Sequence, residues 1–264
     1  MSIGEKIEQL DLSLFANPLS HNPEKDAPQS TVEDRRTLLA VQTVARRACP
    51  NYIYLEIGSY KGGSLQPHVV DPLCGKILSI DPRPGATPDT RGTQVYQECS
   101  AESMLGWLKR IPGADVSKIQ TFETTAAKLT GKEIGMRPHL CFIDGEHTDE
   151  AVLTDARFCL SVLAENGVIL FHDANLVFTG LEAFLNELAA KGRPFHPHIL
   201  PGSVFMIEFD AARFCETEPV RGRIQLNYKA YLAGMSDNDW YRRAYHLPVY
   251  RVLRRVRRFF PKRA

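Results

Sequence analysis

The sequence lacks any long apolar run. No stretch of about 18 apolar residues occurs, and the N-terminus has no apolar segment behind a basic start. A membrane-spanning helix and a signal peptide both require such a segment, so we expect neither. The 6 cysteines are scattered with no Cys-x-x-Cys pair, which is typical of free thiols. We therefore expect a cytoplasmic protein, and no internal repeat is apparent.

The sequence also lacks an overall excess of charge of one sign. Its 32 Lys and Arg nearly balance 31 Asp and Glu, so no broad field favours nucleic acid as a partner. The basic residues are unevenly placed, however, because nine of them and no acid fall in 241–264. The first 240 residues thus carry a formal charge of 1 − 9 = −8. A basic tail follows an acidic body.

That tail has an amphipathic pattern. Val249, Val252, Val256 and Phe259 recur at helical spacing among the arginines. Such a helix can lie on an anionic bilayer, which would place the protein at the inner face of the membrane, or the tail can be disordered or dock a partner. Both alternatives stay open here, as does a homo-oligomer.

The length suits one large domain with appendages. A chain of 264 residues with 44% hydrophobic and 24% charged side chains can bury an ample core. Pro-rich and polar clusters near the start show little periodicity of apolar residues. The pattern of apolar and polar residues changes again after the last expected strand. We therefore expect an N-terminal arm over 1–30, a main domain over 31–210 and a C-terminal extension over 211–264.

The stretch 52–81 has the order strand, glycine loop, helix, strand. Two β-rich apolar runs, 53–57 and 77–80, enclose a loop of spacing Gly-x-x-x-Gly-Gly that begins at Gly58. This order is typical of half a nucleotide-binding α/β unit. The loop lacks the Gly-x-Gly-x-x-Gly spacing that admits a pyrophosphate.

Two acids flank this unit. Glu56 stands beside the loop and would repel a pyrophosphate, whereas it would attract a ligand that carries an ammonium and a sulfonium. Asp81 ends the second strand, where a carboxylate can accept hydrogen bonds from ribose hydroxyls. The bland alternative is a glycine turn in another α/β sheet, with Asp81 as a helix cap.

Alternating strands and helices continue along the chain. A helix capped near residue 31 leads into the first strand, and the apolar runs and amphipathic segments that follow are regular. Further strands are expected at 119–122, 139–144 and 168–171, helices at 100–111, 148–163 and 180–190, and a terminal antiparallel pair at 198–200 and 203–209. This order predicts an α/β fold with a mostly parallel sheet closed by an antiparallel hairpin.

Ionisable side chains gather after two of the expected strands. Asp144, Glu146 and His147 follow one strand, and His172 and Asp173 follow another. The carboxyl ends of neighbouring parallel strands share one sheet edge, so these groups can meet in one crevice. Oxygen and imidazole ligands without a thiolate suit Mg²⁺ or Mn²⁺. Alternatively, the two histidines are hydrogen-bonded groups that fix loop geometry; His196 and His198 carry no spacing signal.

Together these motifs resemble the class I S-adenosylmethionine (SAM) methyltransferases, and in particular the family that includes macrocin O-methyltransferase-like and cephalosporin-hydroxylase-like proteins. The resemblance covers roughly 32–209 and is most specific in Ile-Asp-Gly-Glu-His-Thr, with Asp155 beyond it, and Leu-Phe-His-Asp. It implies a Rossmann-like fold with seven strands and helices on both faces. Carried over, it implies Asp144 and Asp173 as metal ligands with His172 where the family has an acid, and Glu146 as a candidate base.

The resemblance implies a SAM-dependent O-methyltransferase that acts on a hydroxyl of a sugar or glycan, as in surface-polysaccharide biosynthesis. Glu146 or His147 would take the proton, and Mg²⁺ or Mn²⁺ would assist. A hydroxylase-like enzyme on the same fold and a SAM-binding accessory subunit are the alternatives. Eleven residues are expected to contact SAM: Glu56, Gly58, Ser59, Tyr60, Gly62, Gly63, Ser64, Asp81, Thr124, Thr125 and Asp144.

Overall fold

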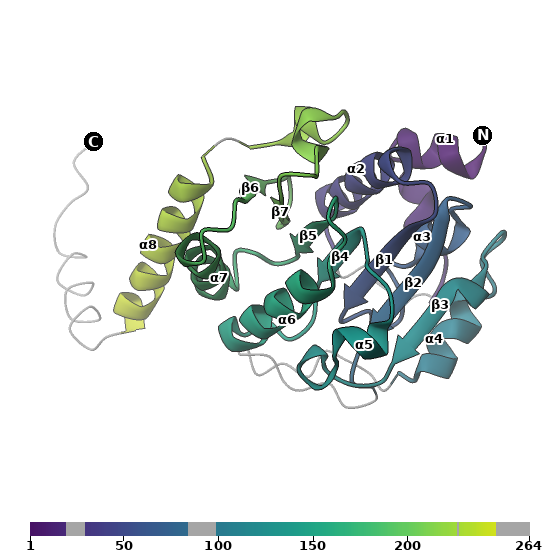
Figure 1. The fold of residues 1–264 in the computed structure, drawn as a ribbon, viewed down its shortest axis with the longest axis horizontal. Helices are drawn as coiled ribbons and strands as arrows, with labels where there is room; N and C mark the ends of the chain where they lie inside the picture. The colour runs from purple at the N-terminus through teal and green to yellow at the C-terminus, as the bar shows by residue number, and fades with distance from the viewer. Residues whose placement is uncertain (20–29, 84–98, 226, 247–264) are drawn as a thin grey trace, which may run out of the picture. The chain divides into compact units, whose positions relative to one another are not determined.

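The structure is a computed structural model that describes residues 1–19, 30–83, 99–225 and 227–246. The chain forms two compact units, 1–226 and 227–264. The first unit contains the sheet (Figure 1). The second contains helix α8 (Tyr228–His246). The expected division at residues 30 and 210 stays a prediction, and the apolar stripe expected from Val249 onward lies outside the described residues.

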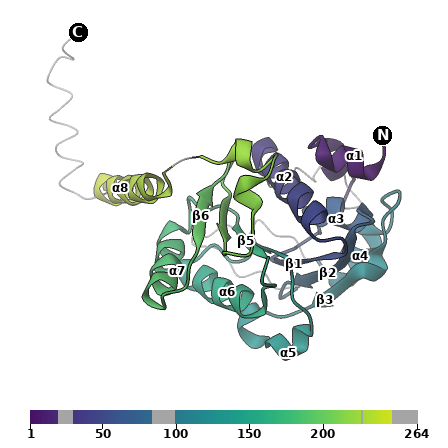
Figure 2. The ribbon, with the colours of Figure 1, turned by 45° about the horizontal axis from the view of Figure 1, so that its top comes forward.

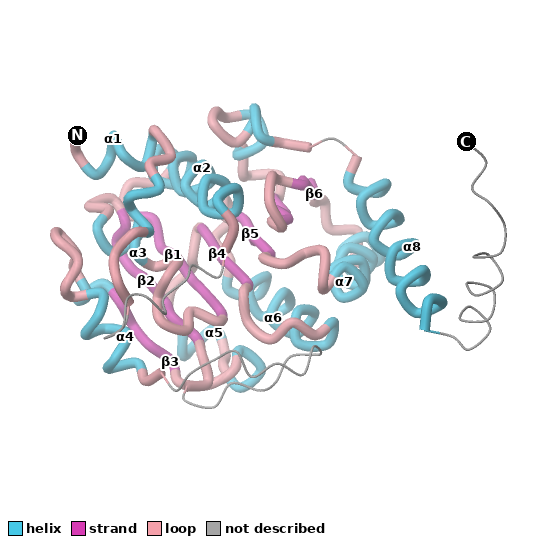
Figure 3. Tube along the Cα trace, turned by 180° about the vertical axis from the view of Figure 1, so that it is seen from behind, coloured by secondary structure: helices cyan, strands magenta, loops and turns pink. Residues whose placement is uncertain are grey.

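A seven-stranded mixed sheet forms the centre of the first unit, in the order β3-β2-β1-β4-β5-β7-β6. The strands are β1 (Tyr52–Ile57), β2 (Cys74–Ile80), β3 (Ile119–Phe122), β4 (Leu140–Ile143), β5 (Val168–Phe171), β6 (His196–Ile199) and β7 (Phe205–Glu208). Neighbours among β1 to β5 pair in parallel, whereas β7 runs antiparallel to β5 and to β6. Figure 3 shows β1 to β5 side by side. The expected sheet with its antiparallel hairpin is confirmed.

Helices cover both faces of the sheet. They are α1 (Ile3–Glu8), α2 (Val32–Ala48), α3 (Gln66–Val70), α4 (Ala101–Leu108), α5 (Gly131–Ile134), α6 (Asp149–Val162) and α7 (Phe178–Ala190). Figure 2 shows α2 and α6 on opposite sides of the strands. Every residue of β4 and β5 is buried, which explains why these strands read as continuous apolar runs without alternation.

Two sets of side chains form the core, one on each face. Tyr54, Phe142 and Leu170 pack with residues of α2, α3 and α4, while α6 packs against β4, β5 and α7. The N-terminal segment joins the first set, because Ile7 of α1 is fully buried and Leu14 and Phe15 of the short helix Leu12–Phe15 are nearly so.

The structure bears on two expectations from the absences in the sequence, the free cysteines and the lack of a membrane span. All six cysteines are free thiols, as expected. Among the described residues, no helix is long and apolar enough to cross a membrane. The location of the protein in the cell stays a prediction.

Candidate functional site

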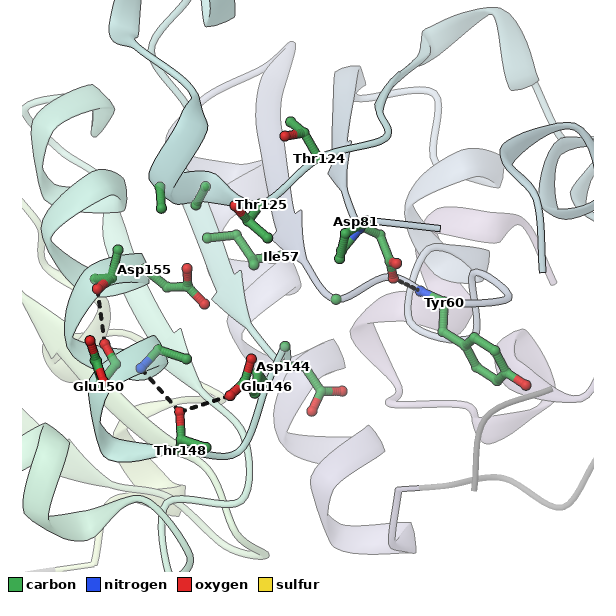
Figure 4. Close-up of a pocket in the computed structure, with 17 residues that line it drawn as sticks. Ile57, Tyr60, Asp81, Thr124, Thr125, Asp144, Glu146, Thr148, Glu150 and Asp155 are labelled. Atoms are coloured by element: carbon green, nitrogen blue, oxygen red, sulfur yellow. Dashed lines mark hydrogen bonds between the residues drawn. The ribbon is translucent and has the colours of Figure 1, made fainter. Parts of the chain in front are cut away.

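A pocket opens at the carboxyl edge of the sheet and has a volume of about 350 Å³. The glycine loop after β1, the end of β2, the segment after β3 and the start of α6 line it. Figure 4 shows Asp81 and Tyr60 on one side of it and Glu146, Thr148 and Asp155 on the other. Predicted SAM contacts that line it are Gly58, Tyr60, Asp81, Thr124, Thr125 and Asp144. The pocket therefore brings together residues from four separate strand ends.

Gly58 allows the ends of β1 and β4 to approach closely. Its φ is +89°, and a Cβ added there would lie 2.1 Å from the backbone oxygen of Asp144. Only glycine has both the conformational freedom and the missing side chain that this contact requires. The glycine loop is thus held against the strand that carries Asp144.

Asp81 fixes the loop that faces it. Its Oδ2 accepts a hydrogen bond of 2.7 Å from the backbone N–H of Tyr60, a residue with φ of +39°. Burial raises the pKa of Asp81, and the nearby Arg83 guanidinium opposes that rise. No hydrogen bond from a described residue reaches the other carboxylate oxygen, Oδ1, so it can accept from the hydroxyls of a bound ribose.

Arg83 holds the same loop through hydrogen bonds. Its guanidinium donates to the backbone oxygen of Tyr60 and to the hydroxyl groups of Ser59 and Ser79. The side chain is almost entirely buried. Sequence analysis missed this role because Arg83 stands in a Pro-rich segment that reads as a plain loop.

The remaining predicted SAM contacts do not line the pocket. Ser59 is buried and shares a hydrogen bond with Ser79, and Glu56 is 1% exposed, with bonds from the hydroxyls of Tyr54 and Ser64. Burial raises the pKa of Glu56 to about 7. Gly62, with φ of +85°, packs on α4 side chains, and Gly63 is exposed. These residues shape the loop in the structure, and their contact with SAM stays a prediction.

Asp155 lines the pocket from α6. Asp155 is 7% exposed, and no described residue donates a hydrogen bond to its carboxylate. Burial, with a further contribution from Glu146, raises its pKa to about 7. A buried acceptor that faces a pocket is available to a ligand that donates hydrogen bonds.

Beside the pocket lies a cluster of carboxylates and imidazoles. His172 Nδ1 is 2.9 Å from Asp144 Oδ1, and His172 Nε2 is 3.5 Å from Oδ2 of Asp34 on α2. Burial lowers the pKa of His172, but Asp144 and Asp34 outweigh that effect and raise it to about 11. His172 therefore bridges two carboxylates as a cation.

His147 occupies the open side of the same cluster. Its Nε2 lies 3.2 Å from Asp173 Oδ2 and 3.7 Å from Asp144 Oδ1, and the two carboxylates raise its pKa to about 9. Asp173 has φ of +46°, a conformation that L-residues adopt rarely and that is frequent at functional sites. The structure thus brings together all three predicted metal ligands and adds His147.

The donor set fits a divalent ion. Asp144, His147 and His172 offer one ligand atom each within 4.8 Å of one another. Within the described part of the chain, the buried Nε2 atoms of His147 and His172 have no hydrogen-bond partner of good geometry. Two carboxylates with imidazole nitrogens suit Mn²⁺ better than Mg²⁺, which prefers oxygen alone. Nδ1 of His172 faces Asp144 and its Nε2 faces Asp34, whereas Nε2 of His147 lies 3.2 Å from Asp173 Oδ2. Asp144, His147 and Asp173 are therefore the ligand set to test first, and His172 as a ligand stays a prediction.

Asp34 is the member of this cluster that sequence analysis missed. Its Oδ2 accepts from the hydroxyl and backbone N–H of Thr31, and its Oδ1 accepts from the backbone N–H of Ser203 at 2.6 Å. The only local signal was the pair Thr31 and Asp34, which is typical of a helix cap. Nothing in the sequence connects this cap to His172.

Comparison with known proteins identifies the fold and a methyltransferase domain within the chain. Residues 55–174 match a family of proteins described as a methyltransferase domain. No curated protein matches the chain by sequence.

Two solved structures share the fold. The O-methyltransferase NovP has a TM-score of 0.56 at 11% identity and covers 80% of this chain and 98% of its own. The cofactor-bound Rv0187 from MTB has a TM-score of 0.50 at 14% identity and covers 72% and 86%. At such low identity these likenesses establish the Rossmann-like fold alone. The matched domain includes the pocket residues from Gly58 to Asp155, so this chain carries a methyltransferase domain of the kind found in SAM-dependent enzymes.

Proposed function

We propose that this methyltransferase transfers the methyl group of SAM to a hydroxyl oxygen of a sugar or glycan. The main support is the position of Asp144, which lines the pocket and also belongs to the cluster with His147 and His172. A hydroxyl bound at the cluster would lie beside a cofactor in the pocket, as in-line transfer requires. NovP is described as an O-methyltransferase, which agrees with an oxygen acceptor.

The pocket residues fit the cofactor. Asp81 is placed to accept hydrogen bonds from the ribose, and Thr124 and Thr125 lie where an adenine edge would meet the segment after β3. Buried Asp155 supplies a further acceptor on the opposite wall. In this arrangement the chain binds and orients SAM and excludes water, while the sulfonium supplies the reactivity.

Asp144, His147 and Asp173 would hold a divalent ion, Mn²⁺ or Mg²⁺. Such an ion, when bound, would orient vicinal hydroxyls and make one of them more acidic. His172 has a different role, because its hydrogen bond to Asp144 and its contact with Asp34 hold the Asp144 carboxylate in place.

Two residues are candidates to accept the proton of the acceptor hydroxyl. Glu146 lines the pocket and its Oε1 accepts from Thr148 Oγ1 at 3.2 Å. His147 belongs to the cluster, where its raised pKa keeps it protonated at neutral pH unless an ion displaces the proton. Because Glu146 lines the pocket and a carboxylate can act as a general base, Glu146 is the first choice.

The wider role is a proposal of the same kind. A lipid-linked glycan in surface-polysaccharide assembly would suit an enzyme whose basic tail contacts the inner face of a membrane. A small sugar free in the cytoplasm would not need that tail. Self-association stays a prediction, as does the absence of a nucleic-acid partner.

The decisive experiment is incubation of the full chain with SAM labelled on the methyl group. Nucleotide sugars and cell-envelope extracts are offered as acceptors, with EDTA or with Mn²⁺ added back. We expect label in a sugar product, less of it after EDTA, and recovery with Mn²⁺. His147→Gln should raise the Mn²⁺ concentration for half-maximal activity by about tenfold or more. His196→Gln, which changes an exposed histidine paired with Asp210, is the matched control and should not.

Each other outcome has a meaning. Full turnover after EDTA would remove the ion from the proposal and leave proton transfer to Glu146, which Glu146→Gln then tests. Oxidised product without label would favour the hydroxylase-like alternative. SAM binding without turnover on any acceptor in the presence of extracts would favour the accessory subunit.

A further inference from the structure

A second group of metal-ligand side chains lies on the β6–β7 hairpin. His196 pairs with Glu208 and His198 pairs with Met206 in the antiparallel register. His198 and Glu208 are therefore diagonal neighbours on one face of the sheet, within reach of each other. His198 Nε2 lies 3.0 Å from Glu208 Oε1.

Glu208 is a buried carboxylate with one oxygen already oriented. Its exposure is 0%, and its Oε2 accepts from the backbone N–H groups of Phe214 and Cys215 at 2.9 and 3.2 Å. These two bonds leave Oε1 directed at His198. Backbone donors that hold the outer oxygen of a carboxylate are typical of the support around metal ligands.

Cys215 completes the group. It belongs to the short helix Phe214–Glu216, which follows the hairpin. Its Sγ, the imidazole nitrogen of His198 and the carboxylate oxygen of Glu208 all lie within 4.8 Å of one another.

We propose that His198, Glu208 and Cys215 form a binding site for a thiophilic divalent cation, with Zn²⁺ as the best match. One nitrogen, one oxygen and one sulfur ligand suit Zn²⁺, whereas Mg²⁺ and Ca²⁺ reject sulfur. Binding displaces the proton of the Cys215 thiol to solvent, so that thiolate and carboxylate together balance the two positive charges. His198 and Cys215 are partly exposed, which leaves a path for entry and room for water as fourth ligand.

A cation at this site would link the short helix Phe214–Glu216 to strands β6 and β7. That segment contributes Phe214 and Val220 to the core beside Met206, and it lies apart from the pocket residues of β1, β2 and β4. A bound cation would therefore stabilise the fold without entering the methyl-transfer chemistry.

The test uses Co²⁺ as a spectroscopic probe on the reduced, metal-stripped full chain. A thiolate ligand gives a strong near-ultraviolet charge-transfer band, and we expect this band to saturate at one Co²⁺ and to vanish when Zn²⁺ is added. The cluster of Asp144, His147 and Asp173 contains no sulfur, so Co²⁺ bound there gives no such band.

Variants locate the band. Cys215→Ser should abolish it and His198→Gln should weaken Co²⁺ affinity by about tenfold or more. Cys49→Ser is the matched control, because Cys49 also contacts a histidine, His139 at 3.1 Å, but among the described residues it belongs to no metal-ligand group. Circular dichroism shows whether each variant folds. A wild-type chain without the band at excess Co²⁺, or a band that persists in folded Cys215→Ser, would overturn the proposal.

Discussion

Oδ2 of Asp34 lies 3.5 Å from Nε2 of His172, so the first turn of α2 is joined electrostatically to the end of β5. Asp34 is 1% exposed, and His172 is 7% exposed. The second Asp34 oxygen holds the turn at Ser203, where Gly202 has φ of +88° and no room for a Cβ beside Asp34. A helix cap, a strand end and a hairpin turn thus position one imidazole next to Asp144.

Replacing Asp34 by asparagine should destabilise the fold strongly. The substitution keeps the shape but removes the negative charge beside Nε2 of His172, so that the imidazolium faces only Asp144 and Asp173 among these carboxylates. Breaking a buried charge pair costs about 3–5 kcal/mol, which chemical denaturation would measure. Asp115→Asn is the control, since Asp115 also caps a short helix, through Ser117, but on the surface. If the free energy of unfolding falls by an equally small amount in both variants, Asp34 does not support the site.

Gly58→Ala should abolish SAM binding, folding or both. The new methyl would lie 2.1 Å from the backbone oxygen of Asp144, and φ of +89° adds strain. Gly113→Ala separates the two effects, because Gly113 has φ of +81° but nothing within 4 Å of the added carbon. Strain alone costs about 1–2 kcal/mol. The melting temperatures of the two variants test this. If Gly58→Ala melted no lower than Gly113→Ala, the clash with Asp144 would be contradicted.

The strands and the glycine loop could be predicted because their signals are local. The run at 168–171 is apolar over the length of one buried strand, and the observed β5 has the same bounds. Strand ends of a parallel sheet share one edge, so the meeting of Asp144, His172 and Asp173 followed from topology.

Contacts between distant segments could not be predicted. Asp34 and Ser203 are 169 residues apart, and neither position has a pattern that names the other. Side-chain direction was equally hidden, because strand alternation does not say whether Glu56 turns toward the ligand or toward Tyr54 and Ser64. His198 lacked a spacing signal for the same reason, since its partners come from β7 and from a later turn.

Asp81→Asn should weaken binding of SAM and S-adenosylhomocysteine. The amide keeps the size of the side chain but loses charge-assisted acceptance from ribose hydroxyls, and hydrogen bonds to a charged group contribute about 1.5–3 kcal/mol. Isothermal titration should therefore show roughly 10- to 150-fold weaker binding. Asp115→Asn should bind as wild type does. If Asp81→Asn bound SAM as tightly as wild type does, Asp81 would not contact the ribose.

Asp155→Asn should make the protein more stable above neutral pH. The pKa of Asp155 is about 7 in the fold against 3.8 for the free side chain, so between these values the unfolded chain has lost a proton that the fold retains. Wild-type stability attributable to this group therefore falls as pH rises from 3.8 to 7 and stays reduced above it. The melting temperature of Asp155→Asn should exceed that of wild type at pH 8 and match it near pH 3.5. An equal difference in melting temperature between Asp155→Asn and wild type at both pH values would contradict the raised pKa of Asp155.

The basic tail is expected to hold the protein on anionic membranes. After His246 the chain has seven basic residues and no acid: Arg251, Arg254, Arg255, Arg257, Arg258, Lys262 and Arg263. Each basic residue near an anionic surface contributes about 1 kcal/mol at most, and salt screens that attraction. The full chain should sediment with phosphatidylserine vesicles at low salt and be released as salt rises.

Two variants separate charge from the apolar stripe. A chain that ends at His246 should stay in the supernatant and still bind SAM, since the pocket lies wholly within residues 57–155. Replacing Arg251, Arg254 and Arg255 by glutamine keeps the apolar residues and should lower binding in proportion to the lost charge. Sedimentation that is equal for all three proteins would rule out the tail as an anchor, and sedimentation with uncharged phosphatidylcholine vesicles would assign the contact to the apolar residues. Loss of SAM binding on truncation would instead make the tail part of the catalytic fold.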